Sequence, residues 1–465
     1  MEKKPLSIEQ LAEKLGLKKA SLLSPPNVPK KESKQDDTPK DSILSEETVK
    51  NPSSAPSSII QKLREKLNET VSITSSPISH GVKGKRDTDF SSGTIIGTED
   101  SQCLWFSEIY PHPYTYGEVV LSDALHFSTH ELKISSAGTE SLDFEVEKAL
   151  FIDTETTSCF GGTGTVAFLV GIGYFKDNDF YLEQFFMRDY DDEPALLLAL
   201  DERIKNASLF IGYNSKCFDL PLIRNRYRMN RLPFHGEHLF HFDLMHVARR
   251  FWNRRLRDCS LNTVEKNILK IRRYGDIPGA VIPRLWLNFI ETGRTHYIPQ
   301  ILEHNRRDIL SLAGLMAWLA QRVQIPKGQG FEEFLDRCAL IRLQMKCNQH
   351  LQAVEIAEDL LQQTDYPPIR SECWKALSDI YRKIEKPEER LHILLQWAKE
   401  DKEVIYPRIE LAKIYEHQQK DIEQALYWTN QALAIEPTNI ELSKRKKRLE
   451  KKMETIKNRE SSDWF

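Results

Sequence analysis

The sequence predicts an α/β region with a mixed sheet covered by helices, followed by an all-α region of repeated helices. Two observations support this fold class. Between about residues 148 and 325, apolar stretches of strand length alternate with segments of helical periodicity, as in α/β layers. From about residue 331 to 440, only helical patterns occur, and they recur at a fixed interval. The length of 465 residues predicts two or three domains, and these two regions are the ones the patterns define.

The residues before these two regions have a different composition. Residues 1–100 are rich in Ser, Pro, Lys, Thr and Asp and poor in aromatic residues. Such a segment buries too little apolar surface to offset its ordering entropy, so we expect it to be largely disordered. Short helices are predicted within it at 5–20 and 57–68, the first either docking on a partner or fraying. Residues 101–147, with Trp105 and Tyr110, predict short strands or a wrapping arm.

The α/β region, 148–325, contains five predicted strands. They lie at 148–153, 165–174, 179–186, 208–212 and 239–242. The first three are separated by short connections, so they should form an antiparallel meander. Six helices should cover the sheet. They lie at 193–205, 218–229, 244–251, 260–269, 283–292 and 297–323.

The helical region, 331–440, has an internal period. Leu343, Leu377 and Leu411 are each 34 residues apart, as are Cys347, Tyr381 and Tyr415. This period resembles the tetratricopeptide repeat, whose stacked helical hairpins bind peptides or other protein partners. The residues after the three leucines are Gln344, Ser378 and Ala412, where that family usually has a small residue. The alternative is a set of ordinary helical hairpins with a coincidental period.

The C-terminal segment, 441–465, is basic. Its charged run is Lys444, Arg445, Lys446, Lys447 and Arg448, followed by Lys451 and Lys452. We interpret the segment as a helix or tail that either contacts nucleic acid or exposes a solvated charged face.

Overall composition sets limits on location and partners. The formal net charge of −3 gives little information about partners. No apolar run reaches the length of about 18 residues needed for a membrane span, so we expect no membrane partner. The first residues lack the apolar stretch of a signal peptide, and the seven cysteines are scattered without a CxxC pair. These features predict a cytoplasmic protein with reduced thiols.

Acidic residues lie on or directly after three of the predicted elements. Asp153 and Glu155 are two positions apart at the end of a strand, so they point to the same face and repel each other unless a cation lies between them. Asp219 opens a helix, where it either serves a site or caps the helix. His304 and Asp308 share one helix face; the alternative is a His–Asp or arginine pair that anchors the helix.

Together these residues resemble a known set of motifs. The acids in chain order are Asp153, Glu155, Asp219 and Asp308. They resemble the DEDD (DnaQ-like) superfamily of 3′–5′ exonucleases, which has a ribonuclease-H-like fold. Its second motif, an Asn followed by a Phe/Tyr–Asp pair, is matched by Asn214 and Phe218 before Asp219. The third motif of the superfamily is either Tyr-x3-Asp or His-x4-Asp. Here His304 lies four positions before Asp308, so a histidine stands at the spacing of the tyrosine motif, and the sequence departs from both patterns.

A longer stretch resembles a narrower group. Residues 149–320, including the sequence Asp-Ile-Pro-Gly at 276–279, are similar to the bacterial YprB-type ribonuclease-H-like proteins. Members of that group can also carry a tetratricopeptide region after the nuclease-like domain. The resemblance covers about 290 residues.

The resemblance implies a nuclease that hydrolyses phosphodiester bonds of DNA or RNA, expected in the 3′–5′ exonucleolytic mode, with two Mg²⁺ or Mn²⁺ ions. It implies that Asp153 bridges both ions and that Glu155 and Asp308 hold the ion that activates water. Asp219 would reach the second ion through water, and His304 would orient or deprotonate the attacking water. The residues implied to bind substrate are Thr154, Asn214 and Phe218.

Other polar residues bear on the same hypothesis. Arginines and lysines are frequent between 224 and 273, with Trp252 among them and Tyr274 next to them, which predicts a nucleic-acid track or a solvated basic face. Asp243 either supports the site or caps a helix. We do not expect His235, His238, His241 and His246 to form a metal cluster, because zinc spacing is absent. The alternative function is a catalytically idle nucleic-acid-binding or scaffold protein.

Overall fold

The computed structural model describes residues 93–138, 145–158, 164–323 and 331–462. The predicted disordered region 1–100, except its last residues, and the predicted helices at 5–20 and 57–68 lie outside the described residues. All described residues belong to one compact unit.

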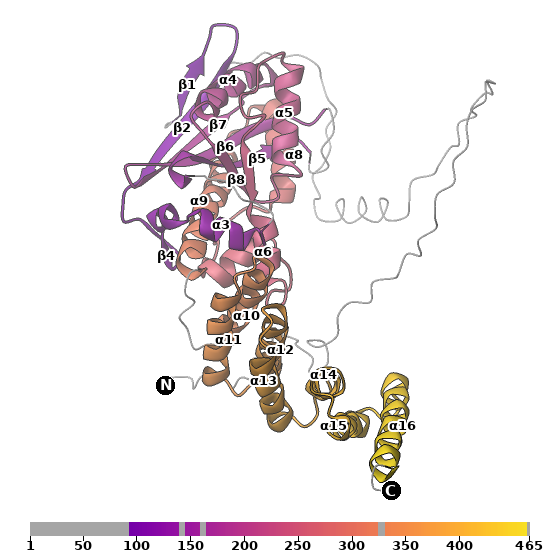
Figure 1. Cartoon of the computed structure of the whole chain (residues 1–465). Helices are drawn as coiled ribbons and strands as arrows, with labels where there is room; N and C mark the ends of the chain where they lie inside the picture. Colours follow the sequence, from indigo (N-terminus) through magenta and orange to yellow (C-terminus); the bar gives the residue numbers. More distant parts are fainter. Residues whose placement is uncertain (1–92, 139–144, 159–163, 324–330, 463–465) are drawn as a thin grey trace, which may run out of the picture. The chain divides into compact units, whose positions relative to one another are not determined.

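A seven-stranded mixed sheet forms the centre of the α/β region (Figure 1). Its strands are β1 (Thr94–Gly97), β2 (Gln102–Tyr110), β5 (Ala149–Thr156), β6 (Ala167–Lys176), β7 (Asp179–Phe186), β8 (Leu209–Gly212) and β9 (Phe240–Asp243). The strand order is β1-β2-β7-β6-β5-β8-β9. The predicted antiparallel meander β5-β6-β7 is confirmed, while β8 and β9 run parallel to β5. The predicted fold class is therefore confirmed.

The sheet extends beyond the predicted strands on the β7 side. Strand β2 pairs antiparallel with β7, from Leu104 opposite Phe186 to Tyr110 opposite Phe180. Residues 102–110 are thus part of the sheet rather than a separate wrapping arm. The following residues form shorter elements: β3 (Thr115–Tyr116), β4 (Val119–Val120), η1 (Leu121–His126), α3 (Thr129–Ser135) and η2 (Val146–Lys148).

Helices cover both faces of the sheet. They are α4 (Glu193–Ile204), α5 (Asp219–Met229), α6 (Leu244–Trp252), α7 (Leu261–Val264), α8 (Ile282–Thr292) and α9 (Ile298–Arg322), with the short turns η3 (Tyr190–Asp192) and η5 (Gly279–Val281). Because side chains alternate along a strand, Phe151 of β5 packs in one core with α6 and α9, and Ile152 packs in the other with α4, α5 and α8.

One predicted helix is divided. The segment expected at 260–269 forms α7 and then a π-helical turn, η4 (Glu265–Leu269), which ends where Lys270 adopts a left-handed conformation. The side chain of Glu265 at the start of this turn is fully buried. Single π-helical turns are frequent at functional sites, and this one lies against α9.

The C-terminal region is all-α, as predicted. Its helices are α10 (Phe331–Lys346), α11 (His350–Gln363), α12 (Pro367–Lys383), α13 (Pro387–Glu400), α14 (Tyr406–Ile414) with the π turn η6 (Tyr415–Gln419), α15 (Ile422–Ile435) and α16 (Ile440–Ser462). Leu343, Leu377 and Leu411 are buried in α10, α12 and α14, the first helix of each successive pair. The period therefore corresponds to helix pairs, and the tetratricopeptide assignment stays a prediction.

Helix α10 packs directly on the α/β region. Leu340 and Leu343 of α10 belong to the same apolar core as Trp252 and Trp318. Ion pairs accompany this contact: Arg255 binds Glu332 at 2.5 Å and also Asp336. Similarly, Arg254 binds Glu372 of α12 at 2.8 Å.

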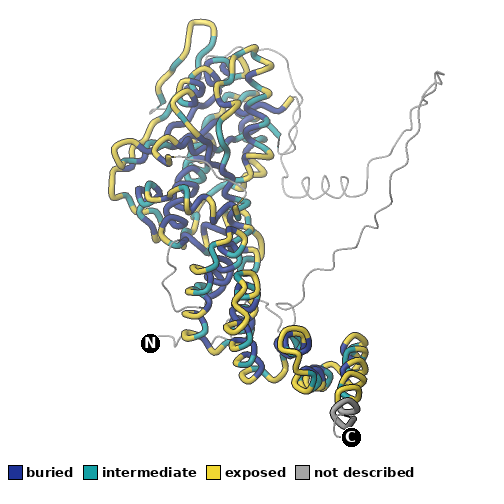
Figure 2. The backbone as a smooth tube through the Cα atoms, viewed as in Figure 1, coloured by how far each residue is buried: buried dark blue, intermediate teal, exposed yellow. Residues whose placement is uncertain are grey.

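The basic run of α16 is partly paired. Arg445, Arg448 and Lys452 each bind the carboxylate of Glu416, at 2.8, 2.8 and 2.9 Å. Glu416 is buried, while much of α16 stays exposed (Figure 2). Part of the basic face thus attaches α16 to the preceding helices. In the described ranges, no helix is both long and apolar enough to cross a membrane.

Candidate functional site

The site lies where β5 meets helix α9. Asp153 and Glu155 alternate with buried residues on β5 and lie on the same face as Phe151, which is the face covered by α9. His304 and Asp308 are one helical turn apart on α9 and point toward this strand. The predicted strand and helix therefore bring together groups that are about 150 residues apart in the chain.

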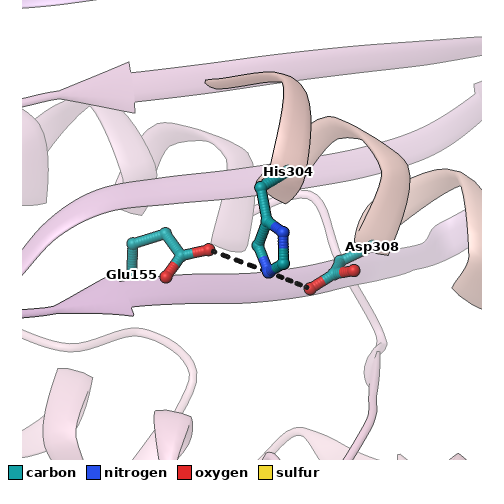
Figure 3. A group of neighbouring side chains, drawn as sticks. All are labelled: Glu155, His304 and Asp308. Carbon is teal, nitrogen blue, oxygen red and sulfur yellow. Dashed lines mark ion pairs between the residues drawn. The ribbon is translucent and has the colours of Figure 1, made fainter. Parts of the chain in front are cut away.

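Glu155, His304 and Asp308 form a close group (Figure 3). The imidazole lies between the two carboxylates: His304 Nε2 is 3.9 Å from Glu155 Oε1 and 3.7 Å from Asp308 Oδ2. One potential ligand atom from each residue lies within 4.8 Å of the others. The side chains are only 12%, 15% and 15% exposed, so the group is largely shielded from water.

Asp153 is held beside this group by Asn305, a residue that the sequence analysis did not select. Asn305 Nδ2 donates to Asp153 Oδ2 at 2.9 Å, and its Oδ1 accepts from Gln184 Nε2 at 2.8 Å. Asn305 is fully buried. The Asn305 amide binds one oxygen of Asp153, Oδ2, and so fixes the orientation of the carboxylate. It does not occupy the other oxygen, Oδ1.

The position of Asn305 depends on a glycine in β6. Gly171 is paired with Asp153 on one side and with Gln184 on the other. A Cβ at this position would be 2.0 Å from Asn305 Oδ1, so only glycine leaves room for the amide. A glycine in the middle of an apolar strand often marks such a close approach, and this was the available sequence signal.

Asp219 lies at the start of α5 and is buried. The Thr154 hydroxyl donates a hydrogen bond to Asp219 Oδ1. The Thr154 side chain is buried and holds Asp219, and its expected role in substrate binding stays a prediction. Asp219 does not belong to the close group of Glu155, His304 and Asp308, although it lies near enough to repel Asp153 and Glu155.

The acids destabilise one another in their charged forms. Burial raises the pKa of Asp153 well above its usual value, and repulsion from Asp308 and Asp219 adds to the effect. Burial and repulsion from Asp153 and Asp308 do the same to the pKa of Glu155. Burial also raises the pKa of Asp219 to about 6, against the hydrogen bond from Thr154. A bound cation would relieve this repulsion.

Arg273 partly balances these charges. Its guanidinium binds Glu265 and Asp308 Oδ1, and it binds Asp276 Oδ2 at 3.1 Å. The Arg273 side chain is only 6% exposed, so its predicted place in a surface track is wrong. The predicted alternative of an arginine pair that anchors the helix thus applies to one oxygen of Asp308, while the other oxygen faces His304.

Asp276 is a further residue that sequence reasoning did not assign to the site. It lies before η5 and accepts a hydrogen bond of 2.9 Å from His304 Nδ1. Burial tends to raise the pKa of Asp276, but the contacts with His304 and Arg273 outweigh this and the pKa is lowered. The carboxylate therefore fixes which nitrogen of His304 faces Glu155 and Asp308.

The predicted substrate-facing residues lie on the turn between β8 and α5. Asn214 is exposed with a positive φ of 61°, and Phe218 is half-buried just before α5. The Asn214 backbone N–H donates to Asp243 Oδ1 at 2.9 Å, and the Met245 N–H donates to the same oxygen at 3.0 Å. Asp243 is thus the N-cap of α6, and the same carboxylate holds the turn that carries Asn214, so its role in supporting the site stays a prediction.

The predicted basic track is divided between buried and exposed residues. Arg226, Arg254 and Arg255 are bound in ion pairs with acids, and Trp252 is 1% exposed. Tyr274 is 78% exposed. The exposed cations of this stretch include Arg231, Arg249, Arg257, Lys266 and Arg272. A nucleic acid would therefore meet only part of the predicted track.

Of the four histidines considered as a metal cluster, His241 lies in β9, His246 lies in α6, and His235 and His238 precede β9. His235 binds Asp201 at 2.7 Å, whereas His241 shares a hydrogen bond of 2.8 Å with Ser215. Among the described residues, the metal-ligating group identified by geometry contains none of them.

The fold and the site define the class of the protein. Residues 150–320 match the ribonuclease H superfamily, and the chain belongs to it. Members of this superfamily are typically nucleases and generally use divalent metal ions. A similar protein is the uncharacterized protein YprB of Bacillus subtilis (strain 168), which is 30% identical over 349 residues, 72% of this chain and 81% of YprB. The range that matches the ribonuclease H superfamily, residues 150–320, includes every acid of the candidate site.

Proposed function

We propose that this protein is a metal-dependent nuclease that hydrolyses phosphodiester bonds of DNA or RNA, in the 3′–5′ exonucleolytic mode. The observation that carries the proposal is the convergence of Glu155, His304 and Asp308 beside Asp153, inside the domain of the ribonuclease H superfamily. Buried carboxylates with raised pKa values are a suitable environment for divalent cations.

The side chains divide the task of holding the ions. Two Mg²⁺ or Mn²⁺ ions, when bound, supply an activated water and stabilise the leaving oxygen. Asp153 is the proposed shared ligand, and Asn305 holds its carboxylate in one orientation. Glu155 and Asp308, which belong to the close group, are proposed to hold the ion that activates water, and Asp219 is proposed to act on the second ion. The Thr154 hydroxyl orients Asp219.

Exposed and half-buried groups near the site are proposed to hold the nucleic acid. Asn214 and Phe218 lie on the turn that leads to Asp219, within reach of a substrate that enters there. Tyr274 is exposed, and its carbonyl accepts a hydrogen bond from Arg307, next to Asp308 in α9. An exposed aromatic ring is suited to stacking on the bases of a single strand.

The helical region is proposed to bind a protein partner. Its helix pairs repeat with a period of 34 residues, as in tetratricopeptide arrays. Such arrays use their concave face for peptides or other proteins. This role is separate from hydrolysis and would direct the nuclease to its place of action.

Degradation of end-labelled oligonucleotides with Mg²⁺ or Mn²⁺ tests the catalytic proposal. We expect Asp153→Asn and Asp308→Asn to lose at least about 100-fold in rate, since each removes a charged ligand of the ions. Asp258→Asn, an exposed acid outside the site, is the control. Strands blocked at the 3′ end should resist cleavage. Unchanged rates in both site variants would refute the proposal.

The second candidate is a catalytically idle nucleic-acid-binding or scaffold protein. The observation that favours it is the contact of Arg273 with Asp308 Oδ1, which already neutralises part of the site. Calorimetry separates the two functions. Retained nucleic-acid binding without binding of millimolar Mn²⁺ would favour this candidate.

A further inference from the structure

The imidazole of His304 is fixed on one side and open on the other. Its Nδ1–H donates to Asp276 Oδ1 at 2.9 Å. Its Nε2 has no hydrogen-bond partner within the described part of the chain, and it faces Glu155 and Asp308 at 3.9 and 3.7 Å. These distances are too long for hydrogen bonds. The second nitrogen thus points an available lone pair at two carboxylates.

We propose that His304 binds a metal ion through Nε2, together with Glu155 and Asp308, and that Asp276 orients it for this role. The ion is the one that the proposed nuclease would use, so the inference rests on that function. It differs from the sequence expectation, in which His304 orients or deprotonates water. It also makes the site selective for a transition-metal ion such as Mn²⁺ over Mg²⁺.

The spacing of the three side chains fits one ion. Ligand atoms bound to the same ion at about 2.1 Å are at most about 4.2 Å apart. Both distances from His304 Nε2, 3.9 and 3.7 Å, are below that limit. The potential ligand atoms of all three residues lie within 4.8 Å of one another. Small side-chain movements would therefore bring them all within the roughly 4.2 Å that one ion allows. A cation at the centre would also neutralise two carboxylates, which a water molecule would not.

Asp276 controls which nitrogen is available. A neutral imidazole carries one N–H, and a carboxylate on Nδ1 keeps the proton there and leaves Nε2 as the ligand. A histidine that binds metal usually donates its other N–H in this way. Arg273 supports both ends of the arrangement, because it binds Asp276 Oδ2 at 3.1 Å and also Asp308 Oδ1. Asp308 Oδ2 is left to face the ion.

The ligand set determines the metal preference. Mg²⁺ is bound by oxygen and keeps several water molecules. Imidazole nitrogen favours transition-metal ions instead. A site with one imidazole and two carboxylates therefore discriminates between Mn²⁺ and Mg²⁺ more strongly than a site built only from acids.

Pulsed electron paramagnetic resonance of the full-length protein loaded with Mn²⁺ tests the inference directly, since a coordinated imidazole gives a ¹⁴N coupling. We expect the coupling in the wild type and its loss in His304→Gln. In calorimetry, His304→Gln should weaken Mn²⁺ binding by about 10-fold or more, and Asp276→Asn should weaken it by about 10- to 100-fold while keeping the coupling. Mg²⁺ binding should change less in His304→Gln.

A second carboxylate–histidine pair provides matched controls. His235 Nδ1 binds Asp201 Oδ2 at 2.7 Å, outside the site. His235→Gln and Asp201→Asn should leave the coupling and Mn²⁺ affinity unchanged. Because the wild-type spectrum needs no variant, the result does not depend on how His304→Gln folds.

The outcomes for the two proposals are separable. Mn²⁺ binding without a ¹⁴N coupling, or no Mn²⁺ binding, would overturn the assignment of His304 as a ligand. If Mn²⁺ binds without a ¹⁴N coupling, nuclease activity that is present in the wild type and abolished by Asp153→Asn would still support the proposed nuclease. A ¹⁴N coupling that is lost in His304→Gln, in a protein that degrades no nucleic acid, would instead support the metal site and count against the nuclease.

Discussion

Asn305 lies over Gly171, with its Oδ1 atom 2.0 Å from the point that a Cβ on this glycine would occupy. This contact lets α9 approach β6 closely enough for Asn305 to donate to Asp153 at 2.9 Å. Gln184, on the next strand, holds the same amide from the other side. The orientation of Asp153 thus depends on the absence of a side chain at one position of the neighbouring strand.

Gly171→Ala should displace Asn305 and weaken both stability and the site. Overpacking in a dense core costs about 1–3 kcal/mol of unfolding free energy, to be measured by chemical denaturation. Activity and Mn²⁺ affinity should fall as well, because Asp153 loses its donor. Gly164→Ala is the matched control, since a Cβ there meets nothing within 4 Å.

A double variant of Gly171 and Asn305 separates the steric effect of a Cβ at position 171 from the loss of the hydrogen bond between Asn305 and Asp153. Asn305→Ala removes the group that Gly171→Ala displaces, so the double variant should be more stable than additivity predicts. It should remain as inactive as Asn305→Ala. Additive losses of stability would contradict the proposed contact.

Arg273→Leu tests whether this arginine is structural. It would leave the fully buried Glu265 without its cation, a change that typically costs 3–5 kcal/mol. We expect a large drop in the urea midpoint. Arg272→Leu changes the adjacent, exposed arginine and should alter stability by no more than about 0.5 kcal/mol. Equal, small effects of both variants would contradict the buried network.

The sequence predicts which residues share a face of one strand or helix, but it does not predict which residues from distant parts of the chain meet. The two-residue period of β5 predicts that Asp153 and Glu155 share a face, and the helical period predicts that His304 and Asp308 do. Both faces are confirmed. In contrast, Asn305 and Asp153 are 152 positions apart, and no local pattern reports that they meet. Composition likewise treats buried Arg273 and exposed Arg272 alike.

The edge of the sheet illustrates the same limit. Residues 102–110 have the aromatic and β-branched character of a strand, and strands were one of their two predicted structures. Their partner β7 begins at Asp179, far along the chain, so no short turn signals the pairing. The choice between an arm and a sheet strand depends on this distant pairing.

Burial of His241 should contribute a loss of stability in mild acid, opposed by Asp153, Glu155 and Asp219, whose raised pKa values favour the folded state as the pH falls. Burial lowers the pKa of His241 from 6.5 to about 4, against the opposing effect of Asp243. As the pH falls, His241 is therefore protonated in the unfolded chain before it is protonated in the folded protein. The contribution of neutral His241 to the free energy of unfolding is present above pH 6.5 and is lost as the pH falls toward 4. The full loss is about 3 kcal/mol.

Denaturation at several pH values between 4 and 7.5 measures this contribution. His241→Gln keeps a hydrogen-bonding group for Ser215 but cannot titrate, so the loss that His241 contributes toward pH 4 should be missing from its curve. His238→Gln, at an exposed position, should retain the wild-type slope. Parallel curves for the wild type and His241→Gln would rule out His241 as the source.

Glu416→Gln should loosen helix α16. The buried Glu416 carboxylate binds Arg445, Arg448 and Lys452, and removal of its charge leaves three cations around a neutral amide. Hydrogen bonds with charged partners contribute about 1.5–3 kcal/mol each, less where the cation is exposed to solvent, as Arg448 and Lys452 are in part. Hydrogen exchange of residues 440–456 should therefore accelerate, while exchange in β5 and α9 should not change. Glu423→Gln, an exposed acid on α15, should leave α16 protected. If exchange in α16 is unaffected by Glu416→Gln, its attachment depends on apolar contacts such as the buried Leu449, and the basic run is available to bind nucleic acid.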